Sequence, residues 1–170
     1  SHEEAAASRA LGEEILDRYH QAAREPGRET LATEVTVQRR YDTFVLFGKI
    51  DRLDRRPDGA LEVIDYKSGR YVYTEDDVRE SLAMTVYQLL VSRENPGVAV
   101  YTGILNLRTG DGAFVLRTED ELDVFEREVR ALVGTITDDA VKAPVPGEQC
   151  RRCPYPSVCP EGRAWLRAND

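Results

Sequence analysis

The sequence of 170 residues is poor in cysteine, in long apolar segments and in positive charge. It has three cysteines, all between Cys150 and Cys159, so we do not expect the disulfide framework that stabilises small secreted proteins. No apolar run approaches the roughly 20 residues of a membrane-spanning helix, and no secretory segment is visible. We therefore expect a cytoplasmic protein in a reducing environment, with no membrane partner.

Acidic residues outnumber basic ones by 31 to 23, which gives a net charge of −8 at pH 7. A chain of this charge is not a polycation that coats nucleic acid, although it can still contain a local basic groove. Arginines do cluster within residues 39–56, and again between the cysteines as Arg151 and Arg152. Solvated surface is an equally good interpretation of any one of them.

The composition, with 41% hydrophobic and 32% charged residues, is typical of a folded protein, and the length fits one compact domain over residues 1–170. Ser1 and His2 resemble the remainder of a cleaved expression tag, so the fold is predicted without them. Ala, Glu and Leu at helical spacing predict an amphipathic helix over 3–24, which ends before Pro26.

Segments rich in Val, Ile, Phe and Tyr then predict three consecutive strands in an antiparallel meander, over 33–38, 44–53 and 60–66. The last segment, 144–170, contains five prolines and all three cysteines, so we expect an irregular Cys-rich tail without regular structure. This order of elements predicts an α/β (α+β) fold, a sheet flanked by helices. The elements predicted between the meander and the tail are a helix over 74–92, strands over 98–107 and 113–117, and a helix over 118–136.

Two carboxylates and a lysine lie on neighbouring predicted strands. Asp65 and Lys67 share one face of their strand because side chains alternate, and Asp51 can lie opposite them on the preceding strand. Neighbouring acids repel unless a divalent cation binds them or a pKa rises, and oxygen ligands with open positions suit Mg²⁺ or Mn²⁺. A nearby lysine can orient a water and oppose charge on a phosphate. The alternative is a surface ion pair between Asp65 and Lys67.

The segment GKIDRLDRRPDGALEVIDYKSG, residues 48–69, resembles the core of the PD-(D/E)XK nuclease superfamily, most closely its RecB-like branch. The resemblance implies a restriction-endonuclease-like core with a central mixed sheet flanked by helices. It also implies the roles of four residues. Asp51, Asp65 and the main-chain carbonyl of Tyr66 would bind the catalytic metal, and Lys67 would position the attacking water.

The RecB-like branch also has a Q-L-x-x-Y motif on the next helix, whose glutamine helps to position the lysine and the DNA strand. Gln88 and Leu89 match this motif, which makes Gln88 a further candidate catalytic residue. Position 92 is a serine, so the tyrosine of the motif has no counterpart there. Tyr87, directly before Gln88, is the candidate substitute.

Cys150, Cys153 and Cys159, in the spacing C-x2-C-x5-C, resemble the C-terminal cysteine triplet of iron-sulfur RecB-like nucleases such as AddB and the CRISPR-associated exonucleases. In those proteins a fourth, upstream cysteine completes a 4Fe–4S cluster. This chain has no cysteine before Cys150, so the fourth ligand is absent from it. Free thiols, or a zinc site completed by His20 or a carboxylate, are the alternatives.

Two residues near the amino end depart from the RecB-like pattern or add to it. Many RecB-like nucleases have an active-site histidine on the first helix, preceded by a glycine. In this chain, Leu16 occupies the position of that glycine relative to His20. Glu34, at the start of the first predicted strand, is an additional candidate ligand, although an acid at a strand end is often only solvated.

Together the motifs predict a divalent-metal-dependent deoxyribonuclease that hydrolyses phosphodiester bonds. It would be an exonuclease, or an enzyme that processes ends and single strands in DNA repair, recombination or CRISPR adaptation. DNA is the expected partner, with a helicase or another nuclease-complex subunit as a second one. The alternatives are a catalytically idle RecB-like domain that binds DNA or serves as a scaffold, and a zinc-stabilised interaction domain.

Overall fold

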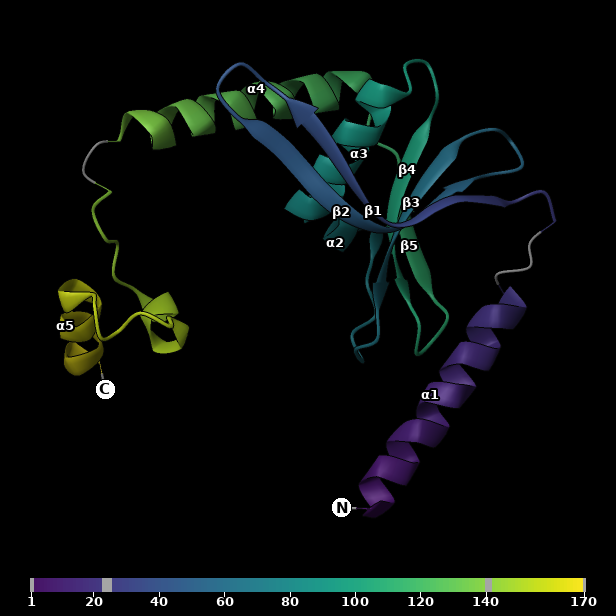
Figure 1. Ribbon diagram of the computed structural model, residues 1–170, viewed down its shortest axis with the longest axis horizontal. Coiled ribbons are helices and arrows are strands. Elements are labelled where there is room, and N and C mark those ends of the chain that lie inside the picture. Colours follow the sequence, from purple (N-terminus) through teal and green to yellow (C-terminus); the bar gives the residue numbers. More distant parts are fainter. Residues whose placement is uncertain (1, 23–25, 140–141, 170) are drawn as a thin grey trace. The chain divides into compact units, whose positions relative to one another are not determined.

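The computed structural model describes residues 2–22, 26–139 and 142–169 (Figure 1). The chain forms two compact units, which we call unit 1 (residues 1–129) and unit 2 (residues 130–170). No helix within the described ranges is both long enough and apolar enough to span a membrane. The expectation of a single nuclease-like domain stays a prediction.

Unit 1 contains a five-stranded sheet with the strand order β1-β2-β3-β4-β5. β3 and β4 are parallel, and the other neighbouring strands are antiparallel, so the predicted mixed sheet and the predicted antiparallel meander are both confirmed. α2 and α3 make the crossover that a parallel pair requires. The elements in chain order are α1 (His2–Ala22), β1 (Glu29–Arg40), β2 (Val45–Arg55), β3 (Leu61–Lys67), α2 (Glu75–Glu80), α3 (Leu82–Glu94), β4 (Val100–Asn106), β5 (Gly112–Val115) and α4 (Glu119–Asp138), whose last residues belong to unit 2.

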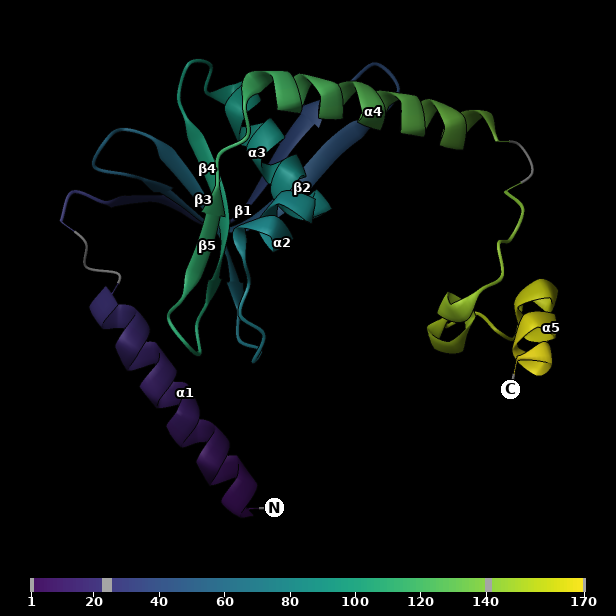
Figure 2. The same cartoon turned by 180° about the vertical axis from the view of Figure 1, so that it is seen from behind.

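One face of the sheet packs against α2 and α3, which lie in front of it in Figure 2. Leu61 and Val63 of β3 belong to this interface, and because side chains alternate along a strand, Asp65 and Lys67 continue the same face. The predicted pair of functional side chains therefore begins where the apolar core ends. Two clusters of buried apolar residues form this core: one contains Val37, Ile50, Leu61, Val63, Leu90, Val91 and Val100, and the other contains Val78, Met84, Ile104, Ala113 and Val115.

The crossover consists of two helices, so the prediction of one helix over 74–92 is wrong. Ser81 interrupts it with φ −70° and ψ 113°, ending α2 and capping α3 through a hydrogen bond that its Oγ accepts from the N–H of Met84 (3.4 Å). Serine hydroxyls compete for backbone groups in this way and favour helix ends. Thr74 and Asp77 form a capping box at the start of α2.

The proline content predicts an irregular tail, but part of the tail is helical. Unit 2 contains a 3-10 helix, η1 (Glu148–Arg152), and a helix, α5 (Pro160–Ala168). Pro160 lies in the first turn of α5, where its missing N–H costs no hydrogen bond. Cys159 caps the same helix, because its Sγ accepts the N–H of Gly162 (3.3 Å). Proline therefore helps to start this helix.

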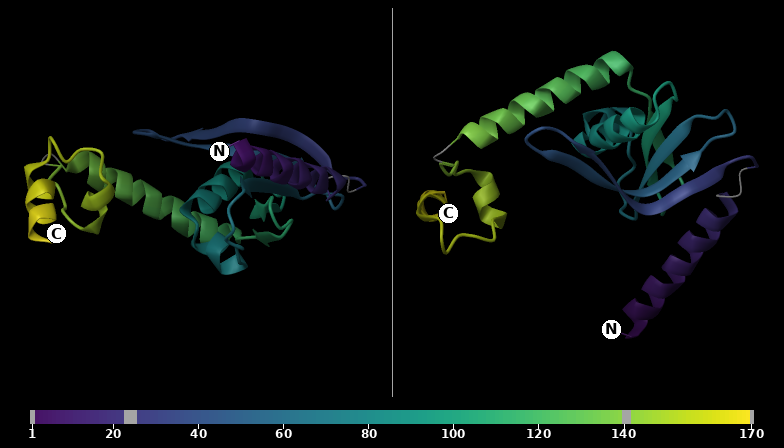
Figure 3. Two further views of the ribbon diagram at one scale, coloured as in Figure 1. Left: turned by 90° about the horizontal axis from the view of Figure 1, so that it is seen from below. Right: turned by 45° about the horizontal axis from the view of Figure 1, so that its top comes forward.

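β1 and β2 continue beyond the rest of the sheet as a two-stranded ribbon (Figure 3). β3 pairs only with Arg52–Arg55 of β2, so residues 35–40 and 45–50 pair only with each other. Val37 and Ile50 on the inner side of this ribbon are buried in the core with Leu90 of α3. The outer side of the ribbon is exposed.

A capping box closes the start of α4. The Oγ1 of Thr118 accepts the N–H of Glu121 (3.2 Å), and the Glu121 carboxylate accepts the N–H of Thr118 (2.7 Å). We expect Thr118→Ala to lower the free energy of unfolding by about 1 kcal/mol in urea titrations, with Thr118→Ser close to the wild type.

The same box makes the stability depend on pH. The hydrogen bonds from the backbone and side chain of Thr118 hold the pKa of Glu121 below its usual value. A depressed pKa stabilises the fold above the unfolded-state pKa of about 4.3 and stops doing so as the pH falls through the folded-state value. Glu121→Ala should therefore cost less stability at pH 3 than at pH 7, and equal losses would contradict this assignment.

Candidate active site

Asp65 and Lys67 form an ion pair at the end of β3. Their Oδ2 and Nζ atoms are 2.5 Å apart, with the aspartate side chain 15% exposed and the lysine side chain 43% exposed. The Oδ2 of Asp65 is shielded from solvent and receives no well-directed hydrogen bond in the described structure, only the charge of Lys67. This contact with Asp65 raises the pKa of Lys67 above its usual value. Lys67 is therefore an ammonium at neutral pH.

Asp51 of β2 is joined to the same point of β3. The last register pair between these strands is Arg52 with Ile64, and beyond it the Oδ2 of Asp51 accepts the backbone N–H of Tyr66 (2.8 Å). The charge of Asp51 also helps to raise the pKa of Lys67. The structure thus brings together Asp51, Asp65 and Lys67 as the sequence predicts, with the Tyr66 peptide between them.

Tyr87 of α3 lies against this group. A Cβ atom at Gly48 would be 2.5 Å from Cε1 of Tyr87, so the glycine makes room for the ring beside β2. Burial, followed by the negative charges of Asp65 and Asp51, raises the pKa of Tyr87. Tyr87 of α3 therefore lies near the two carboxylates, a position that the sequence indicated only through the incomplete Q-L-x-x-Y motif.

Glu34 and Lys49 form an exposed ion pair at the edge of the site. The β1–β2 register passes from Thr33–Arg52 to Val35–Ile50, and Glu34 lies between these pairs with φ 51°, a left-handed conformation that is strained for a residue other than glycine. The hydrogen bond to Glu34 raises the pKa of Lys49, and the charge of Asp51 adds to this effect. The role of Glu34 as a metal ligand stays a prediction.

The donor atoms at this site fit a hard divalent cation. Asp65 has a shielded carboxylate oxygen without a directed hydrogen bond, and Asp51 keeps one oxygen that the Tyr66 N–H does not occupy. The described residues contain no cluster of three or more His, Cys, Asp or Glu side chains that could hold a metal. Magnesium does not need one, since it is commonly held by one or two carboxylates and retains several waters.

A comparison with protein families matches residues 2–160 to the PD-(D/E)XK nuclease superfamily. The chain belongs to this superfamily. Nucleases of the PD-(D/E)XK superfamily generally use divalent metals, in agreement with the donor atoms described above. The fold, a mixed five-stranded sheet flanked by helices, is the restriction-endonuclease-like core expected from the sequence.

Among solved structures, the chain is similar to one described as "Crystal structure of SSO0001" and to others. The two chains are 20% identical, and the similarity covers 92% of this chain and 72% of the other, with a TM-score of 0.49. None of the curated proteins compared with the chain matches it.

Gln88, the other expected PD-(D/E)XK site residue on α3, is directed away from the carboxylates. Its side chain is 1% exposed, and in the described structure its amide bonds to Arg117: Nε2 donates to the carbonyl (2.9 Å), and Oε1 accepts the backbone N–H (3.2 Å). Arg117 in turn donates to the carbonyls of Val78 (2.6 Å) and Arg79 in the last turn of α2. Gln88 thus fixes α3 to α2 and to the start of α4, and its role in catalysis stays a prediction.

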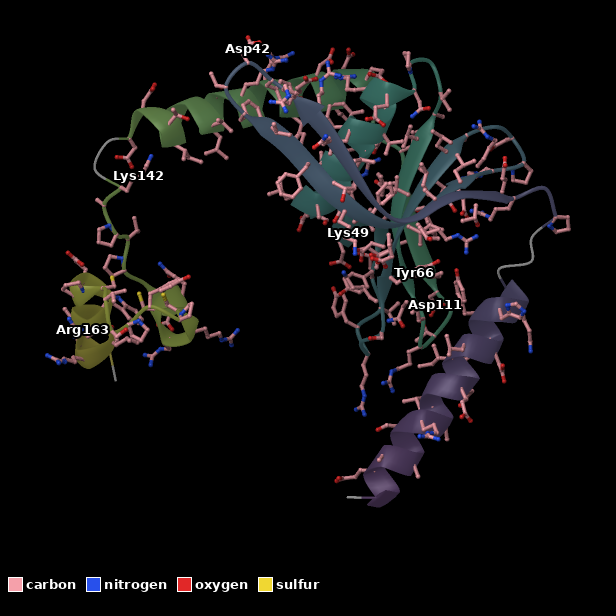
Figure 4. All side chains as sticks on the ribbon, viewed as in Figure 1. Asp42, Lys49, Tyr66, Asp111, Lys142 and Arg163 are labelled. Atoms are coloured by element: carbon pink, nitrogen blue, oxygen red, sulfur yellow. The ribbon has the colours of Figure 1, made fainter. Side chains whose placement is uncertain are left out.

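Tyr66, which Figure 4 labels, alternates with Asp65 and Lys67 along β3, so its side chain lies on the opposite face of the strand. Its hydroxyl is 2.5 Å from the hydroxyl of Tyr19 in the last turn of α1, and the two rings meet edge to face with centroids 5.5 Å apart. Arg52 also donates to the Tyr19 hydroxyl. Burial and the contact with Tyr19 raise the pKa of Tyr66. This contact attaches α1 directly behind the candidate site.

Buried charges on this second face are paired. Asp54 is fully buried and accepts from Nε of Arg52 (2.6 Å) and from Arg28 (3.3 Å). Arg28 also contacts Glu62, which is 4% exposed. A buried carboxylate that lost its partner would be strongly destabilising, so these pairs fix the segment before β1 onto β2 and β3.

The three cysteines lie in unit 2, and each sulfur accepts a backbone N–H. A Cβ atom at Gly162 would be 3.2 Å from Sγ of Cys159 and 3.6 Å from Sγ of Cys150, so these two sulfurs border the same small space. The described structure does not bring the three sulfurs together as a cluster that could hold a metal. The donors are Gly147 to Cys150 (3.5 Å), Tyr155 to Cys153 (3.5 Å) and Gly162 to Cys159 (3.3 Å).

The hydroxyl contact between Tyr19 and Tyr66 generates a prediction about stability. We expect Tyr19→Phe and Tyr66→Phe each to lower the free energy of unfolding by about 1 kcal/mol, because each leaves a polar group without its partner. Since both remove the same hydrogen bond, the double variant should cost less than the sum.

Tyr101→Phe is the matched control in urea titrations, because Tyr101 lies on the same face of the sheet as Tyr66. The guanidinium of Arg56 lies over the ring of Tyr101, a contact that does not involve the Tyr101 hydroxyl. Additive losses from Tyr19→Phe and Tyr66→Phe would show that the hydroxyl contact does not contribute to stability.

Proposed function

We propose that this PD-(D/E)XK chain is a divalent-metal-dependent deoxyribonuclease that hydrolyses phosphodiester bonds at the site formed by Asp51, Asp65 and Lys67. One observation carries the proposal. The shielded Oδ2 of Asp65 faces the Lys67 ammonium at 2.5 Å, and Asp51 is hydrogen-bonded to the peptide that separates them. Such an arrangement is costly in an unliganded protein and useful in one that binds a cation and a phosphate.

The carboxylates of Asp51 and Asp65 and the carbonyl of Tyr66 are the proposed metal ligands. A divalent cation held there would supply Lewis-acid stabilisation of the phosphoryl oxygens and would lower the pKa of a bound water. The hydrogen bond from the Tyr66 N–H orients the Asp51 carboxylate toward β3. The contacts of the Tyr66 ring with Tyr19 support a fixed orientation of the peptide that bears the proposed carbonyl ligand.

Lys67 and Tyr87 are the proposed donors to the reacting phosphate and water. The raised pKa of Lys67 keeps it positively charged at neutral pH, so it can orient a water and oppose the charge that develops on the phosphate. The raised pKa of Tyr87 keeps its hydroxyl protonated, so it can donate a hydrogen bond beside the carboxylates. Gln88 has a positioning role in this proposal, because its amide is committed to Arg117.

The RecB-like motif supports a more specific proposal. The segments D-R-L-D at residues 51–54 and D-Y-K-S-G at residues 65–69 resemble RecB-like nucleases that act on DNA ends or single strands. We place the chain with these enzymes, in repair, recombination or CRISPR adaptation, with a helicase or another nuclease-complex subunit as partner. The catalytically idle scaffold is the alternative that the following assay separates from an enzyme.

We expect the protein to cleave end-labelled DNA with Mg²⁺ or Mn²⁺ and not with EDTA. Asp65→Asn should reduce cleavage at least a hundredfold, because it removes a charged ligand while keeping the shape of the side chain. Lys67→Ala should reduce it to a similar degree. Electrophoresis of the labelled products measures both rates.

The control for the loss of a carboxylate is Glu75→Gln, an exposed change in the first turn of α2. Glu62→Gln is not used as the control because Glu62 is buried in an ion pair with Arg28. Full cleavage by folded Asp65→Asn protein would refute the assignment of this residue. Absence of cleavage by the folded wild type, with retained DNA binding, would favour the scaffold.

We further propose that Cys150, Cys153 and Cys159 bind a metal, supported by their C-x2-C-x5-C spacing. A 4Fe–4S cluster needs a fourth ligand, and the chain has three cysteines. We therefore expect anaerobically purified protein to lack the broad absorbance near about 400 nm of such a cluster. Iron and sulfide in a ratio of one to one, together with that absorbance, would contradict the expectation. Zinc that is present in the wild-type protein and lost in the Cys150→Ser variant would identify a zinc site in place of the cluster.

A further inference from the structure

The end of β3 that bears the candidate catalytic residues is paired on one side only. The register with β2 stops at Ile64, so residues 65–67 pair with β4 alone in the described structure. Beyond that register, β2 contributes the side chain of Asp51, which accepts the N–H of Tyr66 (2.8 Å). Lys67 is the last residue of the strand, and strand ends with few partners are the first to open. The geometry of the candidate site therefore depends on β4 and on the segment that follows Lys67.

Asn106 lies beside Lys67 at the end of β4. The two residues are register partners in the parallel pair, so their side chains share one face of the sheet. The backbone N–H of Leu107 donates to the carbonyl of Lys67 (2.8 Å). Asn106 is only 1% exposed, so it is shielded from any substrate. An influence of Asn106 on a reaction must therefore pass through the residues that it contacts.

The carboxamide of Asn106 joins the segment after Lys67 to the β4–β5 turn, which Figure 4 marks with the label of Asp111. Its Nδ2 donates to two carbonyls of the segment, and its Oδ1 accepts two N–H groups of the turn. A carboxylate or a hydroxyl at this position could not supply both donors. The partners are the carbonyls of Gly69 (3.2 Å) and Tyr71 (2.7 Å), and the N–H groups of Arg108 (2.9 Å) and Thr109 (3.3 Å).

The segment after Lys67 leads from β3 to α2, which covers the face of the sheet that Lys67 shares. Asn106 holds the carbonyls of Gly69 and Tyr71 near the start of this segment. At its other end Tyr73 packs against the second of the two core clusters, and its ring meets that of Tyr71 edge to face with centroids 4.9 Å apart. The segment therefore has two anchors, the amide of Asn106 and the core.

We propose that Asn106 is a positioning residue, which holds the end of β3 and the segment after it and thereby fixes Lys67 against Asp65. This role rests on the proposed nuclease function. A residue that orients a reacting group raises the rate without touching the substrate, because a displacement of about 1 Å can lower a rate about a hundredfold.

Amide hydrogen exchange of the whole chain tests the anchor without reference to activity. The variant is Asn106→Ser, because a serine hydroxyl can still accept N–H groups of the turn but has one donor for the two carbonyls. Exchange of residues 65–67, measured by mass spectrometry of overlapping peptides, should become at least about tenfold faster, and exchange of residues 61–63 should stay within about twofold. Asn106→Ala also removes the contacts with the turn and should have the larger effect.

Asn95→Ala is the matched control. The Nδ2 of Asn95 donates to the carbonyl of Val91 (2.9 Å) at the end of α3, so this variant also loses a hydrogen bond between a side-chain amide and a carbonyl. Asn95 precedes β4, whereas Asn106 ends it. Asn95→Ala should leave both the exchange of residues 65–67 and kcat within about twofold of the wild type, because distant sites act independently.

Cleavage of end-labelled DNA at saturating Mg²⁺ tests the connection to Lys67. Asn106→Ser should lower kcat at least about tenfold and leave KM within about twofold, because it displaces a reacting group and removes no contact with DNA. In the Lys67→Ala background the same change should alter kcat less than about twofold, because the effects of residues that act as a unit are not additive. A merely structural role of Asn106 would lower kcat in both backgrounds.

Three results would overturn the role of Asn106. The first is unchanged exchange of residues 65–67 in folded Asn106→Ser protein. The second is an equal loss of kcat with and without Lys67, and the third is an equal loss of kcat in Asn95→Ala. Absence of cleavage by the folded wild type would instead refute the proposed function, and the exchange data would then decide whether Asn106 holds the end of β3.

Discussion

The alternation of side chains along β3 is the constraint on which unit 1 depends. The side chains of Leu61 and Val63 point into the core beneath α3. Because side chains alternate, the other odd-numbered residues of β3, Asp65 and Lys67, lie on that same face at the edge of the core. Tyr66 then points to the other face, where it contacts Tyr19. One strand therefore presents the charged pair on one side and attaches α1 on the other. A slip of one residue in its register would exchange the two faces and lose both contacts.

Charged groups on both faces of β3 are enclosed, and each face compensates for them differently. Behind the sheet, Asp54 and Glu62 are buried against arginines, which satisfies the carboxylates permanently. In front, Asp65 has a shielded oxygen with only the neighbouring ammonium of Lys67 and no directed hydrogen bond in the described structure. Asp65 thus depends on one partly exposed cation, whereas the rear carboxylates contact arginines that are largely buried.

Much of this arrangement could be predicted from the sequence, because it follows from period-2 alternation and from a short turn between two strands. That reasoning brought Asp51 next to Asp65 and Lys67, and it gave the meander. It could not distinguish Tyr87 from Gln88, since adjacent residues on a helix point about 100° apart and the direction of α3 depends on where the helix begins. The start of α3 depends on Ser81, whose hydroxyl ends one helix and caps the next, and helical periodicity continues across such a break. The same limit applies to α5, where counting prolines missed that Pro160 occupies the first turn.

The strongly negative net charge and a nucleic-acid substrate are compatible because electrostatic attraction is local. At physiological ionic strength the Debye length is about 8 Å, so exposed acids farther from a phosphate than that are largely screened. Several carboxylates of unit 1 are already neutralised by close arginines, including Asp54 and Glu62 behind the sheet and Glu126 beside Arg93. Asp51 and Asp65 at the candidate site are the groups that a divalent cation would neutralise before a phosphate approaches them.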